Sequence, residues 1–152
     1  MQTLFERIGG SATFEKLTAE FYRGVAKDPL LKPMYPEEDL GPAERRLNMF
    51  LQQYWGGPDT YQQERGHPRL RMRHAPYRIG PQAKAAWLGH MRRAVDSLEL
   101  APVDEGELWD YLERAATAML NRSFASRARV HGQNSTGPSP LRCRPLSLRP
   151  FA

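Results

Sequence analysis

The residues with the clearest chemical capability lie in an irregular stretch at 59–80. Its centre reads HPRLRMRHAPYRI from position 67 to position 79. A neutral imidazole such as that of His74 can ligate a transition metal, and arginines beside it can pair with carboxylates. By residue type alone, a structural or solvent-exposed histidine is the simpler interpretation. The sequence around His74 must therefore decide between these alternatives.

This stretch is a long connection with an apolar component. Gly66, Pro68, Pro76 and Gly80 interrupt regular structure, so only a short helix at 70–74 is expected before Pro76. Long loops in compact domains usually have a function or are disordered. The stretch also contains apolar residues, which predict that it packs against the rest of the domain.

Four longer helices are predicted to position this stretch. Apolar residues recur at helical spacing over 13–27, from Pro42 to Tyr54, over 81–98 and over 103–121. The chain has 17 Leu and six Met against four Val and two Ile, a balance that favours helices over strands. We expect an all-α domain made of two helix pairs around the irregular connection.

The length and charge of the chain limit the number of domains and the kinds of partner that we expect. The chain of 152 residues suits one domain, and its net charge of +5 equals the five arginines that lie beyond residue 124, where no Asp or Glu occurs. Residues 1–124 are therefore formally neutral, and a nucleic-acid-binding face is not indicated. We expect residues 125–152 to form a disordered, basic tail rich in Pro, Ser and Arg.

Cysteine usage and apolar runs predict the compartment. The single cysteine, Cys143, cannot form an intrachain disulfide, which suits a reducing cytoplasm. No apolar run is long enough for a transmembrane segment, and the first residues do not resemble a signal peptide. Phosphate-loop, zinc-protease and nucleophile-elbow motifs are also absent from the sequence.

Several segments in order resemble one family. They are LFERIGG at 4–10, FY at 21–22, MYPEEDL at 34–40, FLQQYWGGP at 50–58, the histidine run at 67–79, and Trp87. Together they resemble the group II truncated haemoglobins, bacterial globins with a two-over-two helical sandwich around haem. The resemblance covers about residues 4–124, so a globin domain is expected at 1–124.

The resemblance implies haem b bound through His74 as the proximal iron ligand. The other ring nitrogen should then donate to a backbone carbonyl, for which Leu70, one turn earlier, is the candidate. Arg73, and less directly Arg71, would pair with the haem propionates. A c-type Cys-x-x-Cys-His motif is absent, so the haem would be held without covalent bonds.

The resemblance also assigns the opposite, distal side of the haem. Tyr22, Tyr35 and Trp87 would be hydrogen-bond donors directed at O2, which slow its release. Ala43 stands where vertebrate globins usually have a distal histidine, and Leu47 would crowd the ligand. Aromatic residues at helical spacing can also be ordinary core.

Further haem contacts follow from the same alignment and stripes. The expected wall residues are Leu47, Phe50, Tyr54, Ile79 and Met119. Arg46 and His67 are candidates for the propionates, although His67 can instead hold the turn at Gly66 and Pro68. His90 and His131 receive no functional role.

Three functions are compatible with these residues. The first is a module that binds O2, and also CO or NO, and releases O2 slowly. The second is a haem enzyme, a peroxidase or a nitric oxide dioxygenase, supplied with electrons by a separate reductase because the chain has no flavin or NAD motif. The third is a haem-free helical protein, against which the retention of His74 and the aromatic donors argues. A homodimer is possible.

Overall fold

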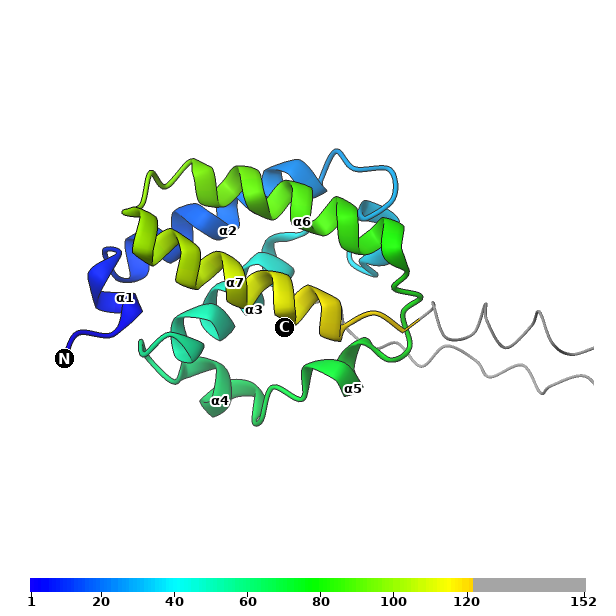
Figure 1. The fold of residues 1–152 in the computed structure, drawn as a ribbon. Coiled ribbons are helices and arrows are strands. Elements are labelled where there is room, and N and C mark those ends of the chain that lie inside the picture. Colours follow the sequence, from blue (N-terminus) through cyan, green and yellow to red (C-terminus); the bar gives the residue numbers. More distant parts are fainter. Residues whose placement is uncertain (122–152) are drawn as a thin grey trace, which may run out of the picture.

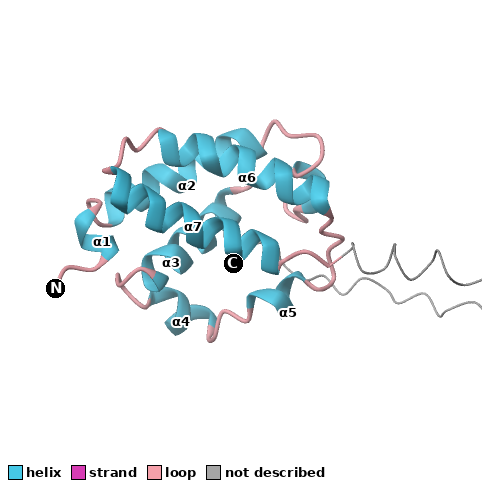
Figure 2. Ribbon diagram, viewed as in Figure 1, coloured by secondary structure: helices cyan, strands magenta, loops and turns pink. Residues whose placement is uncertain are grey.

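The structure is a computed structural model that describes residues 1–121. These residues form helices joined by turns and loops, with no strand among them (Figure 2). The expected all-α fold is thereby confirmed. The expectations for residues 125–152, including Cys143 and His131, lie outside the described residues.

The helices follow one another in a simple order. They are α1 (Leu4–Arg7), α2 (Ser11–Val25), the 3₁₀ helix η1 (Lys32–Met34), α3 (Gly41–Tyr54), α4 (Thr60–Arg65), α5 (Leu70–His74), α6 (Pro81–Asp96) and α7 (Pro102–Ala118). Prolines stand in the first turn of α3, α6 and α7, where a missing N–H costs nothing. The predicted long helices and the short helix at 70–74 are present; α3 ends at Tyr54 as predicted, and α2, α6 and α7 end two or three residues before their predicted ends.

The prediction of only one short helical piece within 59–80 was wrong. A second helix, α4, occupies Thr60–Arg65, and Tyr61 within it is fully buried. The ring of Tyr61 packs edge-on against Phe50, with centroids 5.8 Å apart. This tertiary contact stabilises a helix that is too short to persist alone. The short α1, which a Thr3–Glu6 capping box begins, was not predicted either.

Helix α2 packs against both α3 and α6, and α6 packs against α7 (Figure 1). The α2–α6 approach is close at Gly24, where an added Cβ would lie 2.5 Å from His90 Nδ1. The shorter helices α4 and α5 lie on the side of the domain away from α2 and α6 in Figure 1. This arrangement leaves the end of α5 facing the interior between α3, α6 and α7. Within residues 1–121, no helix is long and apolar enough to cross a membrane.

Candidate functional site

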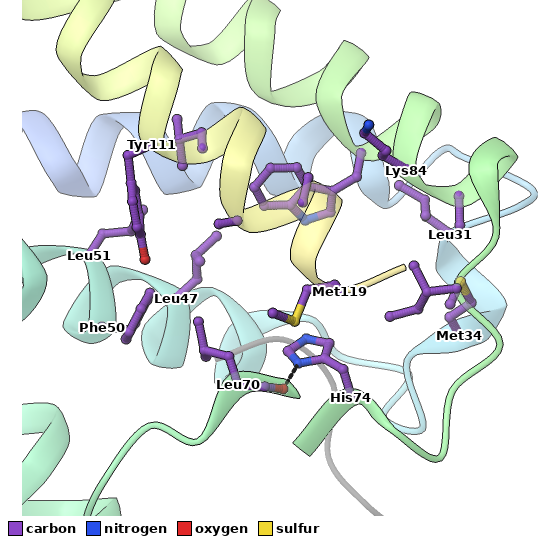
Figure 3. A pocket seen from close by; sticks show the side chains of 16 residues that line it. Leu31, Met34, Leu47, Phe50, Leu51, Leu70, His74, Lys84, Tyr111 and Met119 are labelled. Atoms are coloured by element: carbon purple, nitrogen blue, oxygen red, sulfur yellow. Dashed lines mark hydrogen bonds between the residues drawn. The ribbon is translucent and has the colours of Figure 1, made fainter. Parts of the chain in front are cut away.

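An apolar cavity lies between α3, α5, α6 and α7 (Figure 3). The space between its walls, counting the part open to solvent, is about 640 Å³. The walls are almost entirely aliphatic and aromatic. The lining residues are Leu31, Met34, Leu47, Phe50, Leu51, Leu70, His74, Ile79, Ala83, Lys84, Trp87, Tyr111, Leu112, Ala115, Ala116 and Met119.

His74 is the last residue of α5, and its side chain points into this cavity (Figure 3). The residue is only 3% exposed, and its Nδ1 lies 2.6 Å from the Leu70 carbonyl oxygen, the partner expected from the sequence. Burial lowers the pKa of His74, which favours the neutral imidazole. With Nδ1 as donor to Leu70, Nε2 is the nitrogen whose lone pair can serve a ligand.

Arg73, a predicted propionate partner, contacts backbone instead. Its guanidinium donates to the Pro68 carbonyl at 2.7 Å and to the Arg65 carbonyl at 3.0 Å. It therefore closes the turn between α4 and α5. Arg73 is not among the residues that line the cavity, and its neighbour Arg71 is exposed.

The three predicted distal aromatics form one buried cluster with Phe21. Trp87 lines the cavity, and its ring meets that of Phe21 edge-on at a centroid distance of 5.2 Å. The rings of Tyr22 and Tyr35 lie edge-on to each other, with centroids 5.8 Å apart. Burial raises the pKa of both tyrosines, so both keep their protons as potential donors. Tyr22 and Tyr35 are not among the cavity-lining residues.

Arg46 is a buried cation near the distal cluster. It is 4% exposed, and its guanidinium lies 3.7 Å from the Glu37 carboxylate. Its charge lowers the pKa of Tyr22 and Tyr35, against the larger effect of burial. A buried guanidinium in this place has the charge that a propionate requires, but Arg46 does not line the cavity.

The remaining predicted contacts divide into two groups. Leu47, Phe50, Ile79 and Met119 line the cavity as expected. Tyr54 and His67 do not line it. Tyr54 is 49% exposed, and its ring stacks on that of Tyr111 with centroids 3.9 Å apart. His67 is exposed. The Nδ1 of His67 accepts from the Arg69 N–H at 3.2 Å, which supports the alternative that His67 holds the turn. Ala43 is buried, also outside the lining.

Sequence reasoning missed several wall residues. Tyr111 lies three residues after Leu108 on the predicted stripe of α7, so its spacing carried a usable signal. Leu31 and Met34 come from the connection around η1, where no periodicity points to a cavity. Lys84 is the one cation in the lining, and its residue type gave no indication of this position.

The lining suits a flat, largely apolar cofactor that needs one protein ligand. Its walls are apolar, and one buried, neutral histidine stands among them. Within residues 1–121, no group of three or more His, Cys, Asp or Glu side chains is placed to hold a bare metal ion. This donor set fits a metal enclosed in a macrocycle, which His74 would hold as its protein ligand.

Comparison with known proteins decides the family. The model of the bacterial-like globin family matches residues 3–121. The chain belongs to the bacterial-like globins. Group 2 truncated hemoglobin YjbI of Bacillus subtilis (strain 168) is 41% identical over 120 residues, which cover 76% of this chain and 87% of that protein. The identification as a group II truncated haemoglobin is confirmed.

Solved structures of globins agree with this two-over-two fold. The structure of a thermostable hemoglobin from the actinobacterium Thermobifida fusca has a TM-score of 0.78 and 62% identity, and the match covers 79% of this globin and 98% of that chain. The truncated oxygen-avid haemoglobin of Bacillus subtilis has a TM-score of 0.74 and 40% identity, over 79% and 100% of the two chains. Membership of the globin family implies haem-based binding of small gaseous ligands.

Proposed function

We propose that this globin holds haem b without covalent bonds through His74 and uses it to bind O2 reversibly, with slow release. When bound, haem would supply an iron that takes up diatomic gases. The observation that carries the proposal is the placement of buried His74, oriented by the Leu70 carbonyl, in the same apolar cavity as Trp87.

On the proximal side, the chain's task is to present one imidazole in a fixed direction. The hydrogen bond from Nδ1 to Leu70 selects the tautomer and restrains the ring. Burial keeps the imidazole neutral at ordinary pH, and only the neutral ring can ligate. Leu70, Ile79 and Met119 exclude water from its surroundings.

On the distal side, the task is to offer donors and to limit space. We assign the donor role to Trp87, Tyr35 and Tyr22, whose protonated indole and hydroxyl groups are the expected polar groups there. Leu47 limits the space, and Ala43 has no hydrogen-bonding group. The description of the similar Bacillus subtilis protein as oxygen-avid supports slow release here.

A second candidate is a haem enzyme, either a peroxidase or a nitric oxide dioxygenase, that receives electrons from a separate reductase. The buried cluster of protonated donors favours it as much as it favours O2 binding, because the same groups can hydrogen-bond a peroxide. Sustained consumption of peroxide or nitric oxide with a reductase and reduced nicotinamide would support the enzyme. Stoichiometric binding without turnover would support the carrier.

The primary experiment compares His74→Ala with His67→Ala after expression with haem supply. We expect a Soret band in the unaltered protein and in His67→Ala. In His74→Ala we expect haem loss or altered spectra of the ferrous and CO forms, because the imidazole nitrogen that would hold the iron is removed. An unaltered protein that takes up no haem would overturn the proposed function, and unchanged spectra in His74→Ala would overturn the assignment of His74.

A further inference from the structure

Asn121, which follows the C-terminal end of α7, contacts the segment that leads away from His74. Its side-chain oxygen accepts from the Ile79 N–H at 2.8 Å. Its side-chain nitrogen donates to the Tyr77 carbonyl at 2.7 Å and to the His74 carbonyl at 3.3 Å. Its backbone N–H donates to the Ile79 carbonyl at 3.0 Å. One residue thus joins the end of α7 to three residues of the proximal segment.

The proximal segment needs such support because α5 cannot hold its own position. It spans five residues, far fewer than the roughly 12–15 needed for an isolated helix to persist. Its N-cap, Arg69, has a left-handed backbone with φ of 42° and no side-chain cap. Pro76 disfavours continuation at the other end. Contacts from outside the helix must therefore fix the backbone of His74.

Two side chains supply contacts at the two ends of α5. Arg73 ties the N-terminal side to the carbonyls of Arg65 and Pro68. Asn121 holds the C-terminal side, where the His74 carbonyl also accepts from the Tyr77 N–H at 3.0 Å. Ile79, which Asn121 holds by both backbone groups, lines the same cavity as His74.

An asparagine suits this position chemically. A primary amide has an acceptor oxygen and a nitrogen with two N–H donors in one plane. The segment presents one backbone N–H, from Ile79, and two carbonyls, from Tyr77 and His74. Aspartate has the acceptor but no donor at neutral pH, and serine has neither the reach nor the second donor.

We propose that Asn121 is a positioning residue for the proximal histidine. It fixes the backbone of His74 and Ile79 to the end of α7, and so sets the direction in which the imidazole approaches the haem. This inference rests on the proposed role of His74 as haem ligand. It also connects the proximal segment to α7, the helix that contributes Ala115 and Ala116 to the cavity wall.

The test uses Asn121→Asp in the full chain, with Asn48→Asp as the matched control. Aspartate keeps the size and the acceptor for the Ile79 N–H, but it turns a carboxylate oxygen toward two carbonyls. Asn48 lies on α3, where its oxygen accepts from Gln52 at 2.9 Å, away from the proximal segment. We expect a shifted iron–histidine stretching frequency and roughly three- to tenfold faster haem transfer to apomyoglobin for Asn121→Asp only.

A second variant keeps the proposal falsifiable if Asn121→Asp does not fold. Asn121→Ser should show the same spectral shift and, in the haem-free full chain, faster exchange of the Ile79 amide proton. An unchanged stretching frequency and haem-loss rate in the folded variant would overturn the proposal. Failure of the unaltered protein to bind haem would instead refute the proposed function, and Ile79 exchange would still show whether Asn121 holds the segment.

Discussion

At the residue scale, Trp87 is the predicted distal donor that lines the cavity. Its ring lines the cavity, and Phe21 packs against it edge-on. Indole has one polar group, an N–H donor, so any polar effect of Trp87 on a ligand must come from that donor. A phenylalanine ring keeps the apolar surface and removes the donor. This substitution therefore separates hydrogen bonding from packing.

We expect Trp87→Phe to release O2 faster, by about one to two decades. The reason is that a buried hydrogen bond to a charged or strongly polarised group contributes roughly 1.5–3 kcal/mol. Stopped-flow displacement of O2 by CO measures the rate. Trp109→Phe is the control, since Trp109 lies on α7 under Arg92 and does not line the cavity. Equal rates in unaltered protein and Trp87→Phe would make Trp87 a packing residue only.

At the element scale, the short α5 depends on Arg73. The Arg73 guanidinium bridges two carbonyls that precede the helix, and it also lies 6.0 Å from the centroid of the Tyr61 ring. It therefore links α5 to α4 before any cofactor is considered. Arg71, two residues away, is exposed and is the natural comparison.

We expect Arg73→Ala to lower the free energy of unfolding of the haem-free chain by about 1–2 kcal/mol, because two charge-assisted hydrogen bonds in a half-buried place are lost. Arg71→Ala should change it by less than about 0.5 kcal/mol. Urea unfolding followed by circular dichroism checks both values. If the two substitutions changed the free energy of unfolding by similar amounts, Arg73 would contribute no more to stability than an exposed arginine does.

A second element-scale feature joins α6 to the turn after α2. His90 Nε2 lies 2.6 Å from Asp28 Oδ2, and the other carboxylate oxygen accepts from the N–H groups of Leu30 and Leu31. The hydrogen bond with His90 is the largest cause of a lowered pKa of Asp28. Asp28 thus holds the turn that brings Leu31 to the cavity wall.

The lowered pKa of Asp28 predicts how stability varies with pH. A carboxyl whose pKa is lower in the folded protein adds stability above its ordinary pKa, and this contribution is lost as the pH falls through the lowered value. We expect Asp28→Asn to reduce the free energy of unfolding near pH 7 and to make its decline below about pH 4 shallower. Urea titrations across pH 3–7 test this. Parallel curves for both proteins would contradict it.

At the scale of the whole molecule, the part of the chain that matches the globin family differs in composition from the C-terminal segment. The bacterial-like globin model covers residues 3–121, and the described residues are 1–121. Within the described part of the chain, the cavity-lining residues run from Leu31 to Met119, inside the matched range. Residues 125–152 carry five arginines and no acidic residue, a composition unlike that of the globin domain.

We expect deletion of residues 125–152 to leave the Soret spectrum and the O2 release rate unchanged, because no proposed haem contact lies there. Deletion from Asn121 onward should loosen haem, because it removes the hydrogen bonds to His74, Tyr77 and Ile79. Haem-transfer kinetics of the two truncated chains give the comparison. Haem loss from the shorter deletion would assign the tail a part in the site.

The sequence by itself determined the helical class and the main helices, because apolar periodicity and helix-starting prolines are local properties. The stripe of α3 correctly placed Leu47 and Phe50 at the cavity. It also implied Tyr54, one turn on, but the helix ends there and that ring turns outward to stack on Tyr111. A stripe gives the direction of a face, not the point at which a cavity stops.

Only the tertiary structure decided how His74 is held. The sequence around His74 predicts both the ligand histidine and its hydrogen-bond partner Leu70, which lie one helical turn apart. Asn121 is 47 residues away from His74 and meets it only because α7 folds back across the proximal segment. The Tyr77 carbonyl and both backbone groups of Ile79 bond to Asn121, which comes from elsewhere in the chain, so no local sequence pattern predicts this contact.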